Sequence, residues 1–260
     1  MKGRLDGSLA GEFIRPYIAG GKPAQEGQFP FQVGLQTHYL DEDKDEHTQW
    51  CGGSLIAENV VLTAAHCVDN GFLVEVFLGV VDLAKDPLVI NVTGEGIIEH
   101  DKYREFFADH DIAVLFNMDF LLDKIQTVNL PRKSQKYSDF VKSVGWISGW
   151  GKLGDTKGST EKLQFARRWI LTDDYCEHHF PEYKKDIEIC VDGSHGISAC
   201  NGDSGGPLTI VEKDGSRTLV GVTSYGKFVC EEGFPTVYTR VTAYLEWIKI
   251  LLKILKLLLV

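Results

Sequence analysis

Short apolar or alternating segments, separated by Gly, Pro, Asn and Asp, fill the chain from Ile18 to about Arg240. Regular turn signals and few helical periods between such segments are typical of an all-β barrel or sandwich. The polar stretch 126–137 contains a proline and is predicted to join two β halves of similar size. The segments with the length and alternation of strands are 29–36, 74–81, 87–100, 111–117, 143–151, 208–213, 218–226 and 235–241.

One internal segment, 171–180, has the sequence LTDDYCEHHF and is predicted to be a short helix. Thr172 or Asp173 can cap its first turn, because both side chains accept hydrogen bonds from free backbone N–H groups. The two adjacent histidines in it would point to different faces of most backbones. No metal site is therefore predicted there.

The last twenty residues, 241–260, have a helical pattern that is apolar nearly all round. Lys249, Lys253 and Lys256 fall on one narrow stripe of that helix. The final fourteen residues would span roughly 20 Å, less than a bilayer core of about 30 Å. We expect the first turns, with Tyr244, Trp247 and Ile248, to pack on the second β half. Three alternatives stay open for the remaining residues of the helix: contact with a membrane surface, self-association, or an error in the gene model.

Composition is that of a globular protein of 260 residues, with 43% hydrophobic and 25% charged residues. The formal charge of −10 argues against nucleic acid as a partner, since phosphate binding needs a basic face. Six cysteines without a C-x-x-C spacing favour disulfides over a metal site, and hence an oxidising compartment. Residues 1–17 lack the apolar core of a secretory signal and are predicted to be a propeptide or N-terminal extension.

Three separate segments carry candidate chemistry: LTAAHC with His66, DHDIAVL with Asp111, and GDSGGP with Ser204. Singly, each residue has an ordinary interpretation, as a core histidine, a strand cap and a turn residue. Together they can form a nucleophilic site. A serine hydroxyl is a poor nucleophile near neutral pH, so an imidazole must take its proton and a carboxylate must orient that imidazole.

The order His, Asp, Ser, together with CGGSLI, SGWG, VTSYG and VYTRV, resembles the chymotrypsin/trypsin family of serine endopeptidases, including secreted invertebrate members. The resemblance runs from Ile18 to about Ile250. It implies an all-β fold of two six-stranded antiparallel β-barrels with a C-terminal α-helix. The barrels are expected at about 18–131 and 132–240, the helix from about 241, and an apolar tail at 251–260.

On this resemblance His66 is the general base, Asp111 fixes its tautomer, and Ser204 attacks the peptide carbonyl. The backbone N–H groups of Gly202 and Ser204 are implied to bind the developing oxyanion. Glycine at 202 lets the main chain approach the substrate without a side chain in the way.

The resemblance also implies activation by cleavage before Ile18, whose new amine would pair with Asp203 and order the oxyanion loop. A buried carboxylate is costly unless it is paired. The alternative is that Asp203 caps a local turn. The family usually has Arg or Lys directly before such a start, whereas Tyr17 stands here. Cleavage after Tyr17 therefore requires a chymotrypsin-like activator.

Family position places Ser198 at the floor of the specificity pocket, where a trypsin-like enzyme carries Asp. Gly226 leaves the entrance open, whereas Thr236 is expected to shorten the pocket. We therefore expect cleavage after large apolar residues, with an elastase-like preference for small residues as the alternative. Ser224 begins a segment expected to pair main chain to main chain with the substrate. An ordinary loop role for Ser198 stays open.

The family pairing implies the disulfides Cys51–Cys67, Cys176–Cys190 and Cys200–Cys230. No metal and no cofactor are expected. The expected partners are protein or peptide substrates and protein protease inhibitors, and the chain is expected to be a secreted monomer made as a zymogen. The competing hypothesis is a catalytically silent homologue that regulates other proteins by binding them.

Overall fold

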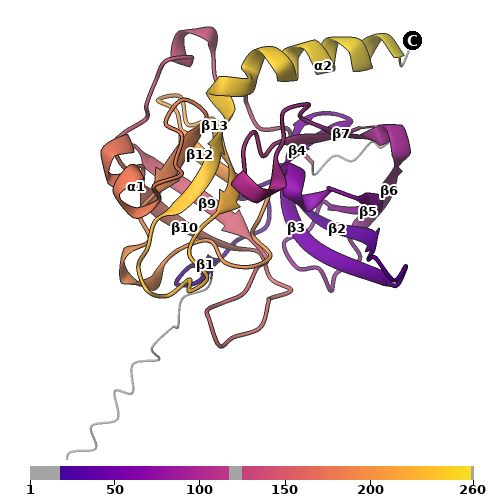
Figure 1. Cartoon of the computed structure of the whole chain (residues 1–260), viewed down its shortest axis with the longest axis horizontal. Coiled ribbons are helices and arrows are strands. Elements are labelled where there is room, and N and C mark those ends of the chain that lie inside the picture. The colour runs from indigo at the N-terminus through magenta and orange to yellow at the C-terminus, as the bar shows by residue number, and fades with distance from the viewer. Residues whose placement is uncertain (1–17, 117–124, 259–260) are drawn as a thin grey trace, which may run out of the picture.

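Two antiparallel seven-stranded sheets lie side by side in the computed structural model, which describes residues 18–116 and 125–258 (Figure 1). The first sheet has the order β6-β5-β2-β3-β4-β8-β7 and the second β1-β10-β9-β12-β13-β14-β11. The strands of the first are β2 (Gln32–Leu40), β3 (Glu46–Ala57), β4 (Val60–Thr63), β5 (Gly71–Leu78), β6 (Leu88–Thr93), β7 (Ile97–Glu99) and β8 (Ala113–Phe116). Those of the second are β1 (Lys22–Pro23), β9 (Val144–Gly149), β10 (Gln164–Trp169), β11 (Glu188–Val191), β12 (Pro207–Val211), β13 (Arg217–Tyr225) and β14 (Thr236–Arg240).

The all-β class with a C-terminal helix is confirmed, and each sheet holds one strand more than the six expected. In the first sheet, β6 and β7 come from one run of sequence that the 3-10 turn Gly94–Gly96 bends. They lie at opposite edges of the sheet, so this bent run links its two edges. In the second sheet, the extra strand is the two-residue β1, which pairs with β10.

Because β1 pairs with β10, the beginning of the described chain belongs to the second sheet and not to the first. Ile18 is 1% exposed and packs in the core of that sheet with Ile147 and Tyr238. The main strands of the first sheet therefore lie between residues 32 and 116, and those of the second between 144 and 240. The first residues of the range expected for the first barrel therefore belong to the second sheet.

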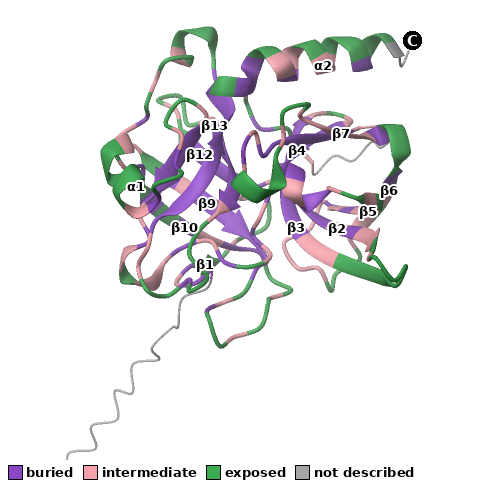
Figure 2. Ribbon diagram, in the orientation of Figure 1, coloured by how far each residue is buried: buried purple, intermediate pink, exposed green. Residues whose placement is uncertain are grey.

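Alternation along the strands fills the two cores. In β5, for example, Val74, Val76 and Leu78 are buried while the residues between them are partly exposed. Burial is concentrated along the strands, and the turns between them are exposed (Figure 2). Pattern analysis missed β1, β3, β4, β10 and β11. In β4 all four residues are buried, so it has no alternation to detect.

The helical predictions are confirmed in outline. Helix α1 spans Asp173–His179, and α2 spans Leu245–Leu258. Thr172 is the N-cap residue of α1, but its side chain makes no capping hydrogen bond. The 3-10 turns are η1 (Ala65–Cys67), η2 (Gly94–Gly96), η3 (Glu105–Phe107), η4 (Lys133–Gln135), η5 (Ser194–Gly196) and η6 (Val241–Tyr244).

Helix α2 packs on the first sheet, so the expectation that it docks on the second β half is wrong. The helix follows η6 in the chain, and in Figure 1 it runs above β4 and β7. The ring of Trp247 lies 5.1 Å from that of His100, and the hydroxyl of Tyr244 lies 3.0 Å from Nδ1 of His110. Ile248 joins the same core cluster as the strands of the first sheet. The helix thus buries its apolar face against the loops that flank β7 and β8.

Candidate active site

Strand pairing in the first sheet brings His66 and Asp111 together. Strands β4 and β8 are antiparallel, with Thr63 opposite Ala113. His66 comes three residues after the end of β4 and Asp111 two residues before the start of β8, so both lie at the same end of the sheet. Nδ1 of His66 donates to Oδ2 of Asp111 at 2.8 Å, and the backbone N–H of His66 donates to Oδ1 at 3.0 Å.

The second sheet completes the surroundings of Asp111. The hydroxyl of Ser224 donates to Oδ2 of the same carboxylate, and that of Thr239 donates to the Asp111 carbonyl at 2.6 Å. The β13–β14 register shifts between Thr223 and Tyr225, leaving Ser224 without a strand partner. Such bulges re-aim side chains, and this one turns Ser224 to the first sheet. The Asp111 carboxylate thus accepts from three donors, and its carbonyl from a fourth, in a residue that is only 1% exposed.

Charge and hydrogen bonding outweigh the effect of burial on the ionisation of His66 and Asp111. Burial by itself lowers the pKa of His66, but the charge of Asp111 and the bond to it raise that pKa above its ordinary value of 6.5. Burial by itself raises the pKa of Asp111, and the neighbouring imidazole and its donors hold it below 3.8. A carboxylate can only accept, so Nδ1 carries the proton and Nε2 of neutral His66 is free to take another.

Backbone contacts hold Ser204 against the strands that carry His66. The N–H of Gly52, in β3, donates to the Ser204 carbonyl at 2.7 Å. A Cβ at Gly205, which has φ +74°, would lie 2.2 Å from Oγ1 of Thr63 and 3.2 Å from the backbone nitrogen of Ala64. Glycine at 205 is therefore required for the Ser204 turn to sit beside the segment leading to His66.

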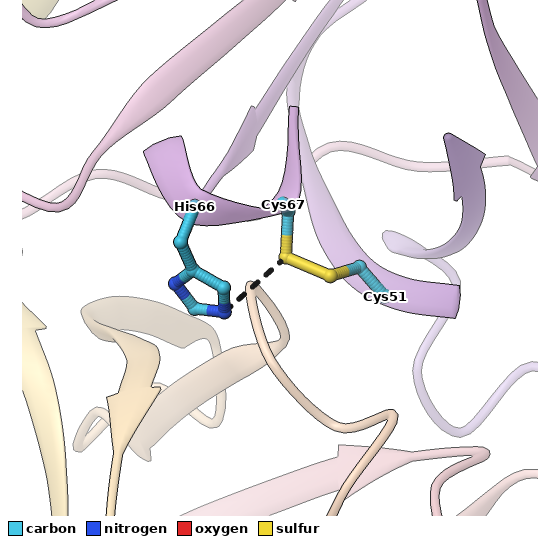
Figure 3. A group of neighbouring side chains, drawn as sticks. All are labelled: Cys51, His66 and Cys67. Atoms are coloured by element: carbon cyan, nitrogen blue, oxygen red, sulfur yellow. Dashed lines mark hydrogen bonds between the residues drawn. A yellow bond between two sulfur atoms is a disulfide. The ribbon is translucent and has the colours of Figure 1, made fainter. Parts of the chain in front are cut away.

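No hydrogen bond joins Ser204 to His66 among the described residues. Nε2 of His66 lies 3.8 Å from Sγ of Cys67, whose disulfide to Cys51 connects η1 to β3 (Figure 3). In ligand-free enzymes the nucleophile–base bond is often long and tightens when substrate binds. Cys51, His66 and Cys67 lie close enough together to suggest a metal site. Both sulfur atoms are bound in the disulfide, so the group offers no thiolate to a metal ion. The same holds for the group formed by Asp155 with the Cys200–Cys230 disulfide.

The backbone conformation of Gly202 is one that residues with a side chain rarely adopt. Its φ is +95°, and a Cβ there would lie 3.0 Å from the Cα of Gly151. Gly202 and Ser204 both line the cavity described below. Among the described residues, the backbone N–H groups of Gly202 and Ser204 donate no hydrogen bond within the protein.

Asp203 is buried between two backbone donors. Its Oδ1 accepts from Gly151 N and its Oδ2 from Cys200 N, both at 2.9 Å. Among the described residues it has no cationic partner, and burial raises its pKa to about 6. The expected partner, the amine of Ile18, would arise only by cleavage. Tyr17, on the other side of that bond, lies outside the described residues.

A cavity of about 540 Å³ opens beside Ser204, and Ser224, Gly226 and Thr236 line it. At Gly226 the nearest atom to an added Cβ would be 3.9 Å away, so the entrance there is open. Ser198 is not among the lining residues, although Ala199 beside it is. The Ser198 hydroxyl donates to the Cys230 carbonyl at 2.7 Å, inside the cavity wall. The described lining carries no carboxylate.

The three implied disulfides, Cys51–Cys67, Cys176–Cys190 and Cys200–Cys230, are confirmed. Cys200–Cys230 fastens two walls of the cavity to each other. Both carboxylate oxygens of Asp155 support this wall, accepting from the N–H groups of Cys230 at 2.6 Å and Glu231 at 3.1 Å.

Several contributors to the site have no sequence signal of their own. The side-chain role of Ser224, the support from Thr239 and Asp155, and the presence of Trp50 and Phe228 in the cavity lining all depend on tertiary contacts. Sequence reasoning gave Ser224 only a main-chain role, because the bulge that turns its side chain is invisible in the pattern.

Comparisons with known proteins relate the chain to serine proteases. The Trypsin family model matches residues 18–248. Serine protease 1 of Drosophila melanogaster is 36% identical over 243 residues, covering 91% of this chain and 86% of that protein. Chymotrypsin-C of Bos taurus is 35% identical over 243 residues, covering 89% and 87%. A solved structure of HL collagenase matches with a TM-score of 0.77 at 34% identity, covering 88% of this chain and 96% of that one.

The fold and the site define a serine protease of the two-sheet, all-β type. The chain belongs to the trypsin family of serine proteases.

Proposed function

We propose that this chain is a serine endopeptidase that hydrolyses peptide bonds through an acyl-enzyme on Ser204. The observation that carries the proposal is the 2.8 Å bond between His66 Nδ1 and a buried Asp111, beside the turn that holds Ser204. This bond orients the imidazole and stabilises the imidazolium that forms during attack.

In the proposed reaction, Nε2 of His66 removes the Ser204 proton as Oγ attacks the carbonyl carbon. The N–H groups of Gly202 and Ser204 bind the oxyanion, and each such donor is worth roughly 10²–10³ in rate. His66 then gives its proton to the leaving amine. Water, activated by the same imidazole, hydrolyses the ester and releases Ser204.

For specificity we propose large apolar residues on the amino side of the cleaved bond. The absence of a carboxylate from the described lining supports this, because a buried Lys or Arg side chain would lack a counter-charge. The open entrance at Gly226 supports a large side chain. Thr236 is among the lining residues, and we expect its side chain to shorten the cavity.

We further propose that the chain is secreted as a zymogen and activated by cleavage before Ile18. Ile18 has φ +50°, a left-handed conformation that is unfavourable for a β-branched residue by about 1–3 kcal/mol. Cleavage frees this torsion and creates a cation for buried Asp203, which has none among the described residues. The Ala19 carbonyl accepts from Ser198 N at 3.0 Å, so the same segment is joined to the loop before Ser204.

A fluorophosphonate probe tests the proposal on protein cleaved before Ile18, verified by N-terminal sequencing. We expect stoichiometric labelling that is lost in Ser204→Ala and retained in a Ser134→Ala control on the exposed turn η4. Lack of labelling in correctly cleaved protein would favour the silent, partner-binding homologue. A peptide library then profiles the labelled enzyme. A dominant preference for Lys or Arg would reject the specificity proposal alone.

A further inference from the structure

Helix α2 extends beyond the part of the chain that matches the family, and its outer face is apolar. The family match ends at residue 248, whereas α2 continues to Leu258. On this added length Ile250, Ile254 and Leu257 are 58%, 47% and 71% exposed. Their spacing of four and three residues places them in one stripe along the helix. Figure 2 shows exposed residues along the side of α2 that faces away from the body.

A basic stripe lies next to this apolar one. Lys253 and Lys256 are exposed, and Lys249 is partly exposed, 3.7 Å from Glu246. Without these three lysines the chain would have 24 basic and 37 acidic residues, a charge of −13. The positive charge of the outer face is therefore a local feature of an acidic protein.

The opposite face of α2 is fixed to the body. Ile248 and Leu255 are 0% and 3% exposed and belong to the core cluster of the first sheet. Because these contacts hold the helix in one orientation, the stripe of Ile250, Ile254 and Leu257 faces outward. No described residue of the chain covers it.

We propose that the outer face of α2 binds the surface of a bilayer containing anionic lipid, with the helix lying along that surface. Adjacent lysines and aliphatic side chains are what such a surface recognises, through charge and through shallow burial at the acyl boundary. The acidic remainder of the chain opposes binding only weakly, because the Debye length is about 8 Å at physiological salt.

Lying along the bilayer also fits the length of the helix. The fourteen residues of α2 span about 21 Å, whereas a bilayer core is about 30 Å thick. Among the described residues no helix is long and apolar enough to cross a membrane.

A second copy of the chain fits this face less well. Symmetric contact would bring six lysines together, and three apolar side chains are few beside the roughly 20–30 residues per side of a stable interface.

Co-sedimentation with vesicles tests the proposal on the full chain carrying Ser204→Ala, which prevents self-cleavage and makes the readout independent of activity. One vesicle set is phosphatidylcholine alone, and the other contains 30% phosphatidylserine. We expect binding to the second set only, weakening as salt increases. Lys249→Gln, Lys253→Gln and Lys256→Gln combined should weaken it about 100-fold, from about fivefold per lysine.

Two controls separate the stripe from net charge and from folding. Lys133, Lys136 and Lys142 are exposed and lie far from α2 in the sequence. Replacing these three with Gln changes the net charge equally and should leave vesicle binding within twofold of the parent. Ser in place of Ile250, Ile254 and Leu257 should abolish binding while leaving the thermal midpoint unchanged.

Equal binding to both vesicle sets, or equal loss in the two lysine variants, would overturn the proposal. Absence of vesicle binding by a protein that instead dimerises through these residues in sedimentation velocity would overturn it in favour of a second copy.

Discussion

Asp203 gives the most direct quantitative prediction, because the uncleaved chain buries its carboxyl group without a cation in the described structure. Its folded pKa is about 6, against an ordinary value of 3.8. At 1.36 kcal/mol per pH unit, this difference makes ionised Asp203 destabilising by about 3 kcal/mol above pH 7. The folded pKa is raised, so the stabilising contribution is fully present below about pH 3.8 and is lost as pH rises through about 6.

Urea unfolding of the uncleaved Ser204→Ala chain, with disulfides intact, measures this contribution. Between pH 4.5 and 7.5 the carboxyl group should remove about 2 kcal/mol from the free energy of unfolding. The same chain with Asp203→Asn lacks that titration, so the difference between the two chains should change by that amount. Other titrating groups are common to both and cancel.

Cleavage before Ile18 should reverse this dependence, since the new ammonium lowers the pKa of Asp203. The cleaved chain should then lose stability as pH falls rather than as it rises. Parallel pH profiles for Ser204→Ala and its Asp203→Asn derivative, in the uncleaved form, would refute the assignment of a raised pKa to Asp203.

Three further predictions concern the site. Ser224→Ala should lower kcat/KM about tenfold or more, because a hydrogen bond to the charged Asp111 is worth about 1.5–3 kcal/mol; steady-state hydrolysis of a small ester measures this, and unchanged kinetics would contradict it. The acid limb of the pH–rate profile should lie above pH 6.5, since activity needs neutral His66 and Asp111 raises its pKa; a midpoint below that value would count against the pair. Cys200→Ser with Cys230→Ser should cost about 2–5 kcal/mol of stability by urea unfolding, more than any effect of Ser134→Ala on the exposed turn η4.

Much of the fold was accessible from the chain alone. Alternation in the segment 74–81 predicts a strand, because one face of β5 is buried and the other is partly exposed. Strand β4 was not predicted, because all four of its residues are buried and its pattern does not alternate. Strand β1 was not predicted, because two residues are too few to show a period. The packing partner of α2 was also not predictable, because its apolar pattern indicates that the helix packs but does not indicate on which sheet.

The candidate triad was accessible only through family resemblance, because His66, Asp111 and Ser204 are far apart in sequence. Their side-chain types indicate the chemistry, but single-sequence patterns contain no distances.

The sequence by itself determined the residue types at the candidate site, the even set of cysteines and the alternation that makes an all-β chain. These are local properties, set by side-chain chemistry and by the two-residue period of a strand. Tertiary structure alone decided that Ser224 donates to Asp111, that Ser198 bonds into the cavity wall, and that α2 presents its lysines outward. Each of these depends on which distant surfaces meet during packing, and no local pattern specifies that.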